Sequence, residues 1–418
     1  MITILCSGTR GDVQPYVALA QQLARLGLQV RVAANQDFES FVRGFGVDYC
    51  PIKVDFTSVG VDPAMIRRAQ RADNVLRMLA TFRRMRGYGA HMVEEYHRAC
   101  LGSDAIVYHP GLAIGRFMAD RAGIPSVLAT PFPLHRTSSR PSVIAYGRMK
   151  PNRLSNRFSH TLIQRMLWMT SEASLKSFWI ARYGALPPDF GMPFERHGPL
   201  HPAVVSCSDH MFPRPPDWSP HVHQHGYWFV EAPEGYRPAP ELEAFLDAGE
   251  KPVYVGFGSM FDPGDTRRVA REVIEALRLA RVRGVVSGMG RIEGLPEGTI
   301  AIDGAPHSWL FPRMAAVIHH GGAGTSAAGF QAGVPSIITP FALDQHAWAH
   351  RAHELGVGPR PVPAKRLTAA KLADAIRAAM SPSVIRRAQS LGEAISAETG
   401  ARDAAMAIAS ALSERARA

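Results

Sequence analysis

The chain has 418 residues, of which 46% are hydrophobic and 20% are charged, and its formal net charge is +11. This length predicts two domains, and the composition excludes a disordered or collagen-like chain. The basic residues lie along the whole chain and form no nucleic-acid-binding motif, so we expect a solvated basic surface and no nucleic-acid partner.

The spacing of the cysteines and the length of the apolar segments indicate in which cellular compartment the protein is expected. Cys6, Cys50, Cys100 and Cys207 are widely separated and show no Cys-x-x-Cys or Cys/His spacing, which predicts neither a metal site nor a disulfide framework. The apolar run at residues 2–6 is too short for a signal peptide, and nowhere do 18 apolar residues follow one another. We therefore expect a cytoplasmic protein that holds no metal.

The first half of the chain alternates short apolar strands with helices. The first strand ends at a glycine-containing turn, a helix begins near Pro15 and ends at Gly27, and a second strand follows. This strand–loop–helix–strand unit is the element of a parallel, doubly wound sheet. The expected elements are strands at 2–6, 30–33, 105–108 and 126–129, with helices at 15–26 and 114–122.

The middle of the chain interrupts this alternation, which then starts again. Residues 133–200 have mixed helical patterns, and residues 211–240 are rich in Pro, Trp and His, which indicates an interdomain linker. We predict an α/β fold with an N-terminal domain at 1–210, a linker at 211–240, a C-terminal domain at 241–385 and a helical tail at 386–418. The second domain is expected to have strands at 252–256, 284–287, 315–319 and 336–339 and a helix at 266–280.

A glycine turn between a strand and a helix carries the strongest chemical signal. Residues 317–326 read Val-Ile-His-His-Gly-Gly-Ala-Gly-Thr-Ser. The glycines would let a pyrophosphate approach the backbone, the helix N-terminus favours an anion, and His320 and Thr325 can donate hydrogen bonds to it. A plain tight turn is the alternative, but it has no need of the paired His319 and His320. The pattern therefore predicts a diphosphate site.

Two other segments follow strands of the same predicted sheet. Asp344 and Gln345 come after the next strand, at the sheet edge where ligands gather in open α/β folds. A carboxylate beside an amide suits vicinal sugar hydroxyls, although the pair could also cap the helix that follows. Gly256-Phe257-Gly258-Ser259 ends an earlier strand and offers either a hydroxyl at this edge or a bare turn.

These motifs give the chain its resemblance to a known family. It resembles the GT-B-fold glycosyltransferases of the UDP-glycosyltransferase superfamily over nearly its whole length. It is most similar to the branch that holds sterol glucosyltransferases and natural-product enzymes of the vancomycin and macrolide type. The resemblance is carried by Gly-Thr-Arg-Gly-Asp-Val-Gln-Pro at 8–15, Pro-His-Ser-Trp-Leu-Phe-Pro-Arg at 306–313, His-His-Gly-Gly-Ala-Gly-Thr at 319–325 and Asp344-Gln345. The turn at 8–15 lacks the full Gly-x-Gly-x-x-Gly fingerprint of dehydrogenases.

The resemblance implies two Rossmann-like domains that face each other across a cleft, and an inverting, metal-independent transfer of a sugar. No cofactor is implied beyond the nucleotide-sugar co-substrate, which is UDP- or dTDP-linked. His320, Thr325 and Ser259 would contact the diphosphate, Asp344 and Gln345 the sugar, and the segment at 306–309 the base and ribose. Trp309 would either stack on the base or pack within its own helix. The donor-site candidates are Gly11, Ser259, His307, Trp309, His320, Gly322, Gly324, Thr325, Asp344 and Gln345.

The general base is expected in the first loop. Many relatives have a histidine there, whereas this chain has Asp12, as the vancomycin and sterol type do. A carboxylate at the mouth of the cleft can take the proton of the acceptor hydroxyl, and partial burial would strengthen it as a base. Asp12 could also cap the helix that begins near Pro15. His109, after the strand at 105–108, is the second catalytic candidate or a polar residue that lines the pocket.

The acceptor side has weaker signals. Residues 65–88 form a basic amphipathic pattern, which indicates either contact with an anionic membrane surface or, as we favour, a pocket-covering helix with a solvated face. The aromatic residues between 133 and 200 would form either an acceptor wall or plain core. We predict transfer of a hexose, glucose from UDP-glucose first, to a hydroxyl of a small lipophilic acceptor such as a sterol or a polyketide.

Three other functions compete with this prediction. The first is transfer of a deoxysugar from a dTDP-sugar to a polyketide or macrolide aglycone, since uracil and thymine present the same hydrogen-bonding edge. The second is a sugar-nucleotide epimerase of the same architecture. The third is a non-catalytic partner protein, which the full set of donor motifs disfavours. The sequence favours no particular oligomeric state.

Overall fold

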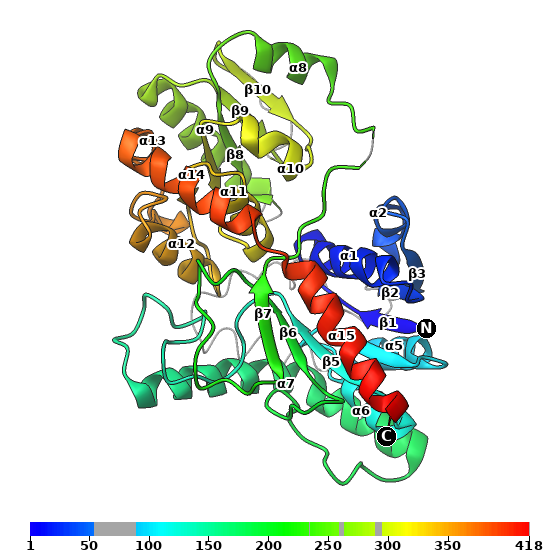
Figure 1. Cartoon of the computed structure of the whole chain (residues 1–418). Coiled ribbons are helices and arrows are strands. Elements are labelled where there is room, and N and C mark those ends of the chain that lie inside the picture. Colours follow the sequence, from blue (N-terminus) through cyan, green and yellow to red (C-terminus); the bar gives the residue numbers. More distant parts are fainter. Residues whose placement is uncertain (54–88, 234, 259–262, 289–294, 418) are drawn as a thin grey trace. The chain divides into compact units, whose positions relative to one another are not determined.

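The computed structural model describes residues 1–53, 89–233, 235–258, 263–288 and 295–417 (Figure 1). The chain divides into two compact units. Unit 1 contains Met1–Ala145, Met149–Val230 and Glu398–Ala418, and unit 2 contains Tyr146–Arg148 and Glu231–Ala397. The basic segment at 65–88 and Ser259 lie outside the described residues.

Unit 1 is built on a seven-stranded parallel sheet with the order β3-β2-β1-β4-β5-β6-β7. The strands are β1 Ile2–Leu5, β2 Val30–Asn35, β3 Asp48–Ile52, β4 Ala105–Tyr108, β5 Ser126–Thr130, β6 Ala203–Ser206 and β7 Val222–Gly226. All residues of β1 and β4 are buried, as continuous apolar runs predict for strands covered on both faces. The strand order reverses between β1 and β4, and a parallel sheet collects ligands at the carboxyl ends of such a pair.

The helices of unit 1 cover this sheet. They are α1 Arg10–Arg25, α2 Glu39–Arg43, α5 Gly89–Cys100, α6 Ile114–Ala122, α7 Arg153–Tyr183 and α15 Gly400–Arg417. α1 buries Val13, Val17 and Leu23 in the same core to which the C-terminal helix α15 contributes Ala405 and Ile408. α15 therefore lies beside α1, although nearly 400 residues separate them in sequence (Figure 1).

Unit 2 repeats the architecture with a five-stranded parallel sheet of order β10-β9-β8-β11-β12. Its strands are β8 Val253–Gly256, β9 Gly284–Ser287, β10 Thr299–Ile302, β11 Ala316–His319 and β12 Ser336–Ile338. Its helices are α8 Pro240–Asp247, α9 Pro263–Ala280, α10 His307–Leu310, α11 Ala323–Gln331, α12 Gln345–Glu354, α13 Ala369–Ala379 and α14 Pro382–Ser396. Separate apolar clusters, one including Ile318 and the other Val317, occupy the two faces of the sheet.

Two parallel, doubly wound α/β sheets were predicted, and this prediction is confirmed. The segment at 211–240 differs from the expected linker, because residues 222–226 form the edge strand β7. Its sequence Val-His-Gln-His-Gly alternates buried and more exposed side chains, which suits an edge strand. The units divide between Val230 and Glu231, and the expected tail is shared, with α14 in unit 2 and α15 in unit 1.

Within the described residues, no helix combines the length and the apolar character needed to span a bilayer. The long helix α7 is polar enough to fail this test despite its 31 residues. This helix buries Trp168 and Trp179 in unit 1.

Candidate functional site

Asp12 lies at the start of α1, directly after β1. Its Oδ2 atom accepts hydrogen bonds from the backbone N–H and the hydroxyl of Thr9, at 2.7 and 2.9 Å. Thr9 as the N-cap residue and Asp12 three residues later thus form a capping box. Gly8 has φ +124, and a Cβ there would lie 2.4 Å from Oδ2 of Asp12, so only glycine fits. The carboxylate is half-buried and held in one orientation.

Gly11 is the second residue of α1, directly before Asp12. It is exposed, and a Cβ at this residue would meet nothing closer than the Thr9 hydroxyl at 3.7 Å. The local packing therefore does not require glycine here, in contrast to Gly8. A direct approach of a ligand to the Gly11 backbone would be the reason for it.

His109 follows β4 and is brought next to the Asp12 turn, because β1 and β4 pair directly. Its backbone N–H donates to the Leu5 carbonyl at 2.9 Å, and its ring meets the Tyr16 ring edge-on with centroids 6.1 Å apart. Burial lowers the pKa of His109, and the Asp12 carboxylate opposes this shift. The imidazole is therefore neutral at pH 7.

The position of the proton on His109 follows from one hydrogen bond. The backbone N–H of Gly111 donates to Nδ1 of His109 at 3.0 Å. Nδ1 must then carry a lone pair, so the proton of the neutral ring lies on Nε2. In this tautomer the free side of the ring offers an N–H donor, whereas Asp12 offers carboxylate oxygens. Among the described residues, no donor is assigned to Oδ1 of Asp12.

In unit 2, the glycine turn after β11 opens the helix α11. Gly322 is the N-cap residue, and the first helical bond runs from the Ser326 N–H to the Gly322 carbonyl. The N–H groups of residues 323–325 therefore have no partner inside the helix and point out of its N-terminus, where they favour an anion. Gly324 is exposed and Thr325 is half-buried, so both can be reached by a ligand.

His320 lies beside this helix N-terminus. A Cβ on Gly322 would come within 2.6 Å of the His320 Nε2, and one on Gly258 would lie 3.7 Å from its Cε1. The ring therefore sits between the end of β8 and the start of α11, in space that the two glycines leave open. Burial lowers the pKa of His320 to about 4, so the ring is neutral at pH 7 and has one N–H to donate. Within the described part of the chain, its Nδ1 is buried without a hydrogen-bond partner.

The side chain of His319 holds the backbone of the glycine turn in place. The backbone N–H of Gly321 donates to Nδ1 of His319 at 3.0 Å, which is the same His-x-Gly bond that His109 makes with Gly111. Gly321 has φ +92, and a Cβ there would lie 2.6 Å from Ile338 and 3.2 Å from the Gln345 carbonyl. The sequence singled out His319 without a role, and the structure gives it this positioning bond.

Asp344 and Gln345 start α12 next to the glycine turn. Oδ2 of Asp344 accepts a 2.8 Å hydrogen bond from the indole N–H of the buried Trp348. Oε1 of Gln345 accepts the backbone N–H groups of Phe341 and Ala342, at 2.8 and 3.2 Å. The Gln345 oxygen therefore holds the loop.

The loop before Asp344 has one strained residue. Leu343 adopts φ +53, which costs a branched side chain of this kind roughly 1–3 kcal/mol. The hydrogen bonds of Gln345 keep the neighbouring backbone in place and offset this cost. Such strain is typical of ligand-binding loops, and here it sits one residue before the Asp344 carboxylate.

The segment at 306–309 splits between two environments. His307 stacks on Phe311 with ring centroids 4.2 Å apart. Burial lowers the pKa of His319, and the nearby His320 and His307 lower it further. Trp309 instead contacts Tyr236 and Arg313, in a depression shared with Lys251 just before β8. Lys251 precedes β8 and so lies at the amino ends of the parallel strands, whereas His320 and Asp344 follow the carboxyl ends of β11 and β12. Trp309 thus lies towards the sheet edge opposite to His320 and Asp344.

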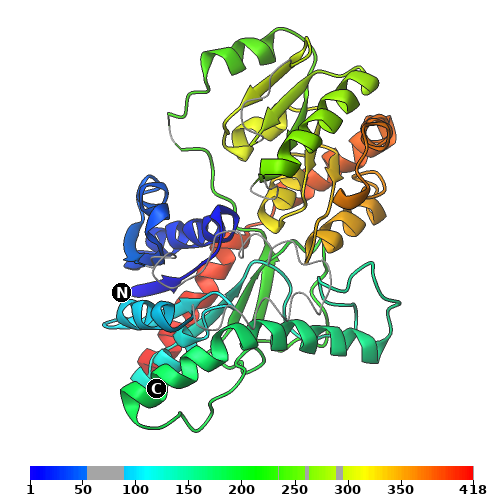
Figure 2. The ribbon, with the colours of Figure 1, turned by 180° about the vertical axis from the view of Figure 1, so that it is seen from behind.

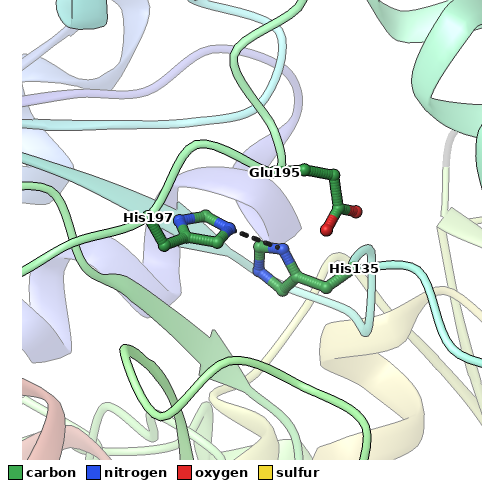
Figure 3. A group of neighbouring side chains, drawn as sticks. All are labelled: His135, Glu195 and His197. Atoms are coloured by element: carbon green, nitrogen blue, oxygen red, sulfur yellow. Dashed lines mark hydrogen bonds between the residues drawn. The ribbon is translucent and has the colours of Figure 1, made fainter.

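A polar group that the sequence did not reveal lies in unit 1 (Figure 3). Nδ1 of His135 and Nε2 of His197 are 3.2 Å apart, and both lie near the Phe194 carbonyl. Glu195 completes a set of the kind that binds zinc. Its Oε1, however, accepts the Arg136 backbone N–H at 2.8 Å and the side-chain amide of Gln164, and lies 3.6 Å from the Arg136 guanidinium. That cation opposes a divalent metal, so we interpret the group as a polar junction between loops.

Two family models match the two halves of the chain. The glycosyltransferase family 28 N-terminal domain matches residues 2–139, and the erythromycin biosynthesis protein CIII-like C-terminal domain matches residues 272–413. Among solved structures, the kitacinnamycin glycosyltransferase covers 98% of both chains at a TM-score of 0.70 and 20% identity. The glycosyltransferase VinC in complex with dTDP covers 99% of both at 0.68 and 17%. These structures show the GT-B fold.

Relatives in sequence extend over the whole chain. A sterol 3-beta-glucosyltransferase of Arabidopsis thaliana is 30% identical over 97% of this chain, which spans 64% of that longer protein. The O-mycaminosyltylonolide 6-deoxyallosyltransferase of Streptomyces fradiae is 33% identical over 97% of this chain and 96% of its own length. The chain therefore belongs to the nucleotide-sugar-dependent glycosyltransferases, in the GT-B family that includes this deoxyallosyltransferase and the sterol glucosyltransferases.

Proposed function

We propose that this protein transfers a hexose, with inversion, from a nucleotide diphosphate to a hydroxyl of a small lipophilic acceptor. The observation that carries the proposal is the neutral His320 beside the N-terminus of α11, in a turn whose glycines leave room for a diphosphate. Backbone N–H groups, the helix dipole and the His320 N–H together form a donor set for an anionic leaving group. This set would stabilise the diphosphate as its bond to the sugar breaks.

Asp12 is proposed as the general base. The acceptor oxygen would attack the anomeric carbon, the bond from that carbon to the diphosphate would break, and the hydroxyl proton would pass to the Asp12 carboxylate. The fixed orientation of the carboxylate by Thr9 supports this role, since its second oxygen remains available to a ligand. Capping and proton transfer are compatible, because they use different oxygen atoms.

His109 is proposed as a hydrogen-bond donor rather than as a second base. To accept a proton on Nε2, the neutral ring would need its own proton on Nδ1, directly opposite the N–H of Gly111. Two N–H groups would then face each other at 3.0 Å, which is unfavourable. The Nε2–H of His109 would instead orient the acceptor or the Asp12 carboxylate.

The sugar is proposed to be glucose carried by UDP, as in the name of the sterol glucosyltransferases. Asp344 would contact adjacent hydroxyls of the sugar, with its carboxylate oriented by the indole N–H of Trp348. A specific observation favours a second candidate, a dTDP-linked deoxysugar. The relative that matches over 96% of its own length is a deoxyallosyltransferase, and the VinC structure contains dTDP.

Competition between UDP-glucose and a dTDP-deoxysugar, with mass analysis of the product, tests the donor. We expect the glucoside to dominate, with a penalty of about 1–3 kcal/mol for each sugar hydroxyl removed at a closed site. A product that carries mainly the deoxysugar would select the second candidate. Release of free UDP only when an acceptor is added would separate a transferase from an epimerase. UDP release without any acceptor, together with isomerised sugar nucleotide, would overturn the proposed transfer.

A further inference from the structure

In the N-terminal half of α7, the first two turns (residues 153–160) have their polar and apolar faces reversed. Their buried residues are Asn156, Ser159 and His160, each at most 2% exposed, whereas the helix buries Ile163, Met166 and Trp168 further along. Its outer face carries Leu154 and Phe158, one turn apart, which are 82% and 67% exposed and are the two most exposed large hydrophobic residues of the described chain. A helix that only covers a protein core would show the opposite pattern.

Hydrogen bonds hold the buried polar side chains of α7 against the neighbouring loop. The Asn156 amide donates to the Ser138 carbonyl at 2.9 Å, and the Ser142 N–H donates to the Ser159 hydroxyl at 2.9 Å. The Gln164 amide donates to the Leu134 carbonyl at 3.2 Å. These bonds fix the rotation of the helix, so Leu154 and Phe158 cannot turn inward without breaking them.

The charge around the two apolar residues has a single sign. Between residues 149 and 171 the charged residues are Lys150, Arg153, Arg157 and Arg165, and there is no Asp or Glu. All four cations are exposed, and none forms an ion pair within the described part of the chain. Both views show this half of α7 projecting beyond the strands of unit 1 (Figure 1 and Figure 2).

We propose that this face of α7 docks on the surface of an anionic lipid bilayer. Phe158 and Leu154 would enter the boundary between headgroups and acyl chains, and the four cations would contact lipid phosphates. The charge complementarity favours anionic lipid over a second copy of this chain, because two such faces would repel each other. The inference deepens the proposed function and rests on it in one respect, namely that the lipophilic acceptor would be collected from the membrane to which the enzyme binds.

Co-sedimentation with vesicles tests the docking. We expect the full chain to bind vesicles of phosphatidylcholine with about a third phosphatidylglycerol and to bind pure phosphatidylcholine at least tenfold more weakly. Binding should fall at least tenfold in the double variant Leu154→Ser/Phe158→Ser, and about fivefold for each of Arg153→Gln and Arg157→Gln, the equivalent of about 1 kcal/mol per cation. Salt at 0.5 M should release the protein, since surface attraction is screened.

Matched controls separate docking from misfolding. Leu101→Ser/Met406→Ser removes two other exposed apolar side chains of unit 1 and should leave vesicle binding unchanged. The conservative variant Phe158→Leu keeps an apolar side chain at this position and should retain most of the vesicle binding. All variants should keep the thermal unfolding midpoint of the wild type. Equal binding to neutral and anionic vesicles, or equal losses in the control pair, would overturn the proposal. So would light scattering that shows a dimer dissociating in the Leu154→Ser/Phe158→Ser variant.

The failure of this inference is distinguishable from the failure of the proposed function. Vesicle binding is measured without donor or acceptor, and sugar transfer is measured with an acceptor dissolved in cyclodextrin. We expect the Leu154→Ser/Phe158→Ser variant to keep its turnover with the dissolved acceptor and to lose it with the same acceptor in anionic vesicles. Loss of turnover in both formats would mean that this face serves the acceptor site itself, which would also overturn docking as its role.

Discussion

Replacing Asp12 by Asn removes the proposed base and keeps its position. The amide oxygen of Asn can accept the same two hydrogen bonds that Thr9 gives to Oδ2, at 2.7 and 2.9 Å. The stability cost is then limited to weaker, uncharged bonds and a weaker interaction with the dipole of α1, about 1 kcal/mol together. A domain of this size would lose a few degrees in unfolding temperature. The fold of unit 1 should therefore survive.

Turnover should fall much more than stability. Loss of general-base assistance costs about 10²- to 10⁴-fold in rate, so we expect kcat of Asp12→Asn to drop by at least about 100-fold while the affinity for UDP stays unchanged. Kinetics with saturating donor and acceptor measure the drop, and calorimetry measures the affinity. Asp37→Asn is the matched control, because it removes another first-turn carboxylate of unit 1 that has no place in the site.

Two results would refute this reasoning about Asp12. Near wild-type kcat in Asp12→Asn would place the base elsewhere, and a large drop in His109→Ala would then identify it. A collapse of the fold in Asp12→Asn, seen as loss of the cooperative unfolding transition, would show that the carboxylate serves mainly the cap. Thr9→Val separates the two roles further, since it removes one capping bond and leaves the carboxylate in place.

Four further outcomes are expected. His320→Ala should weaken UDP binding at least tenfold and leave uridine affinity unchanged in calorimetry; equal losses would mean that His320 does not serve the phosphates. Burial holds the pKa of free His320 at about 4, and a bound diphosphate would raise it, so UDP binding should tighten as the pH falls towards 4, relative to His320→Ala; parallel pH profiles would contradict this. Gln345→Ala should destabilise unit 2 by about 1–3 kcal/mol in urea unfolding, because two backbone N–H groups lose their acceptor, whereas Gln345→Glu should not; equal effects would reject the loop-holding role. Turnover should survive EDTA, and its loss and recovery with magnesium would overturn metal independence.

Much of the fold could be predicted because its central strands are short apolar runs. β1, β2, β4 and β5 were all expected close to their observed positions. The missed strands β3, β6, β7 and β10 lie at or next to the edges of the two sheets, where apolar character is diluted. β3 contains Asp48 and Pro51, which an edge strand tolerates, and β7 contains two histidines in a Pro-rich segment.

The sequence indicated which strands the candidate residues follow, but not the hydrogen bonds that they make. They follow β1 and β4 in the first sheet and β11 and β12 in the second, because parallel topology brings the carboxyl ends of each sheet to one edge. The bonds from Trp348 to Asp344 and from Gln345 to its own loop depend on rotamers that no spacing reveals. His135 and His197 meet across 62 positions, and the sequence has no local signal for such a contact.

The return of the chain to unit 1 has a consequence for the order of events during synthesis. Residues 231–397 of unit 2 are inserted between two parts of unit 1, and α15 supplies Ala405 and Ile408 to the core around β1. At ribosomal rates, roughly 10–40 s pass between the emergence of Val230 and that of α15. By the end of that interval all strands of the inserted unit have been synthesised, whereas the first-made unit still lacks the helix that completes its core. The half that leaves the ribosome first is therefore the half that matures last, and a chaperone that shields Val13 and Val17 would act in this interval.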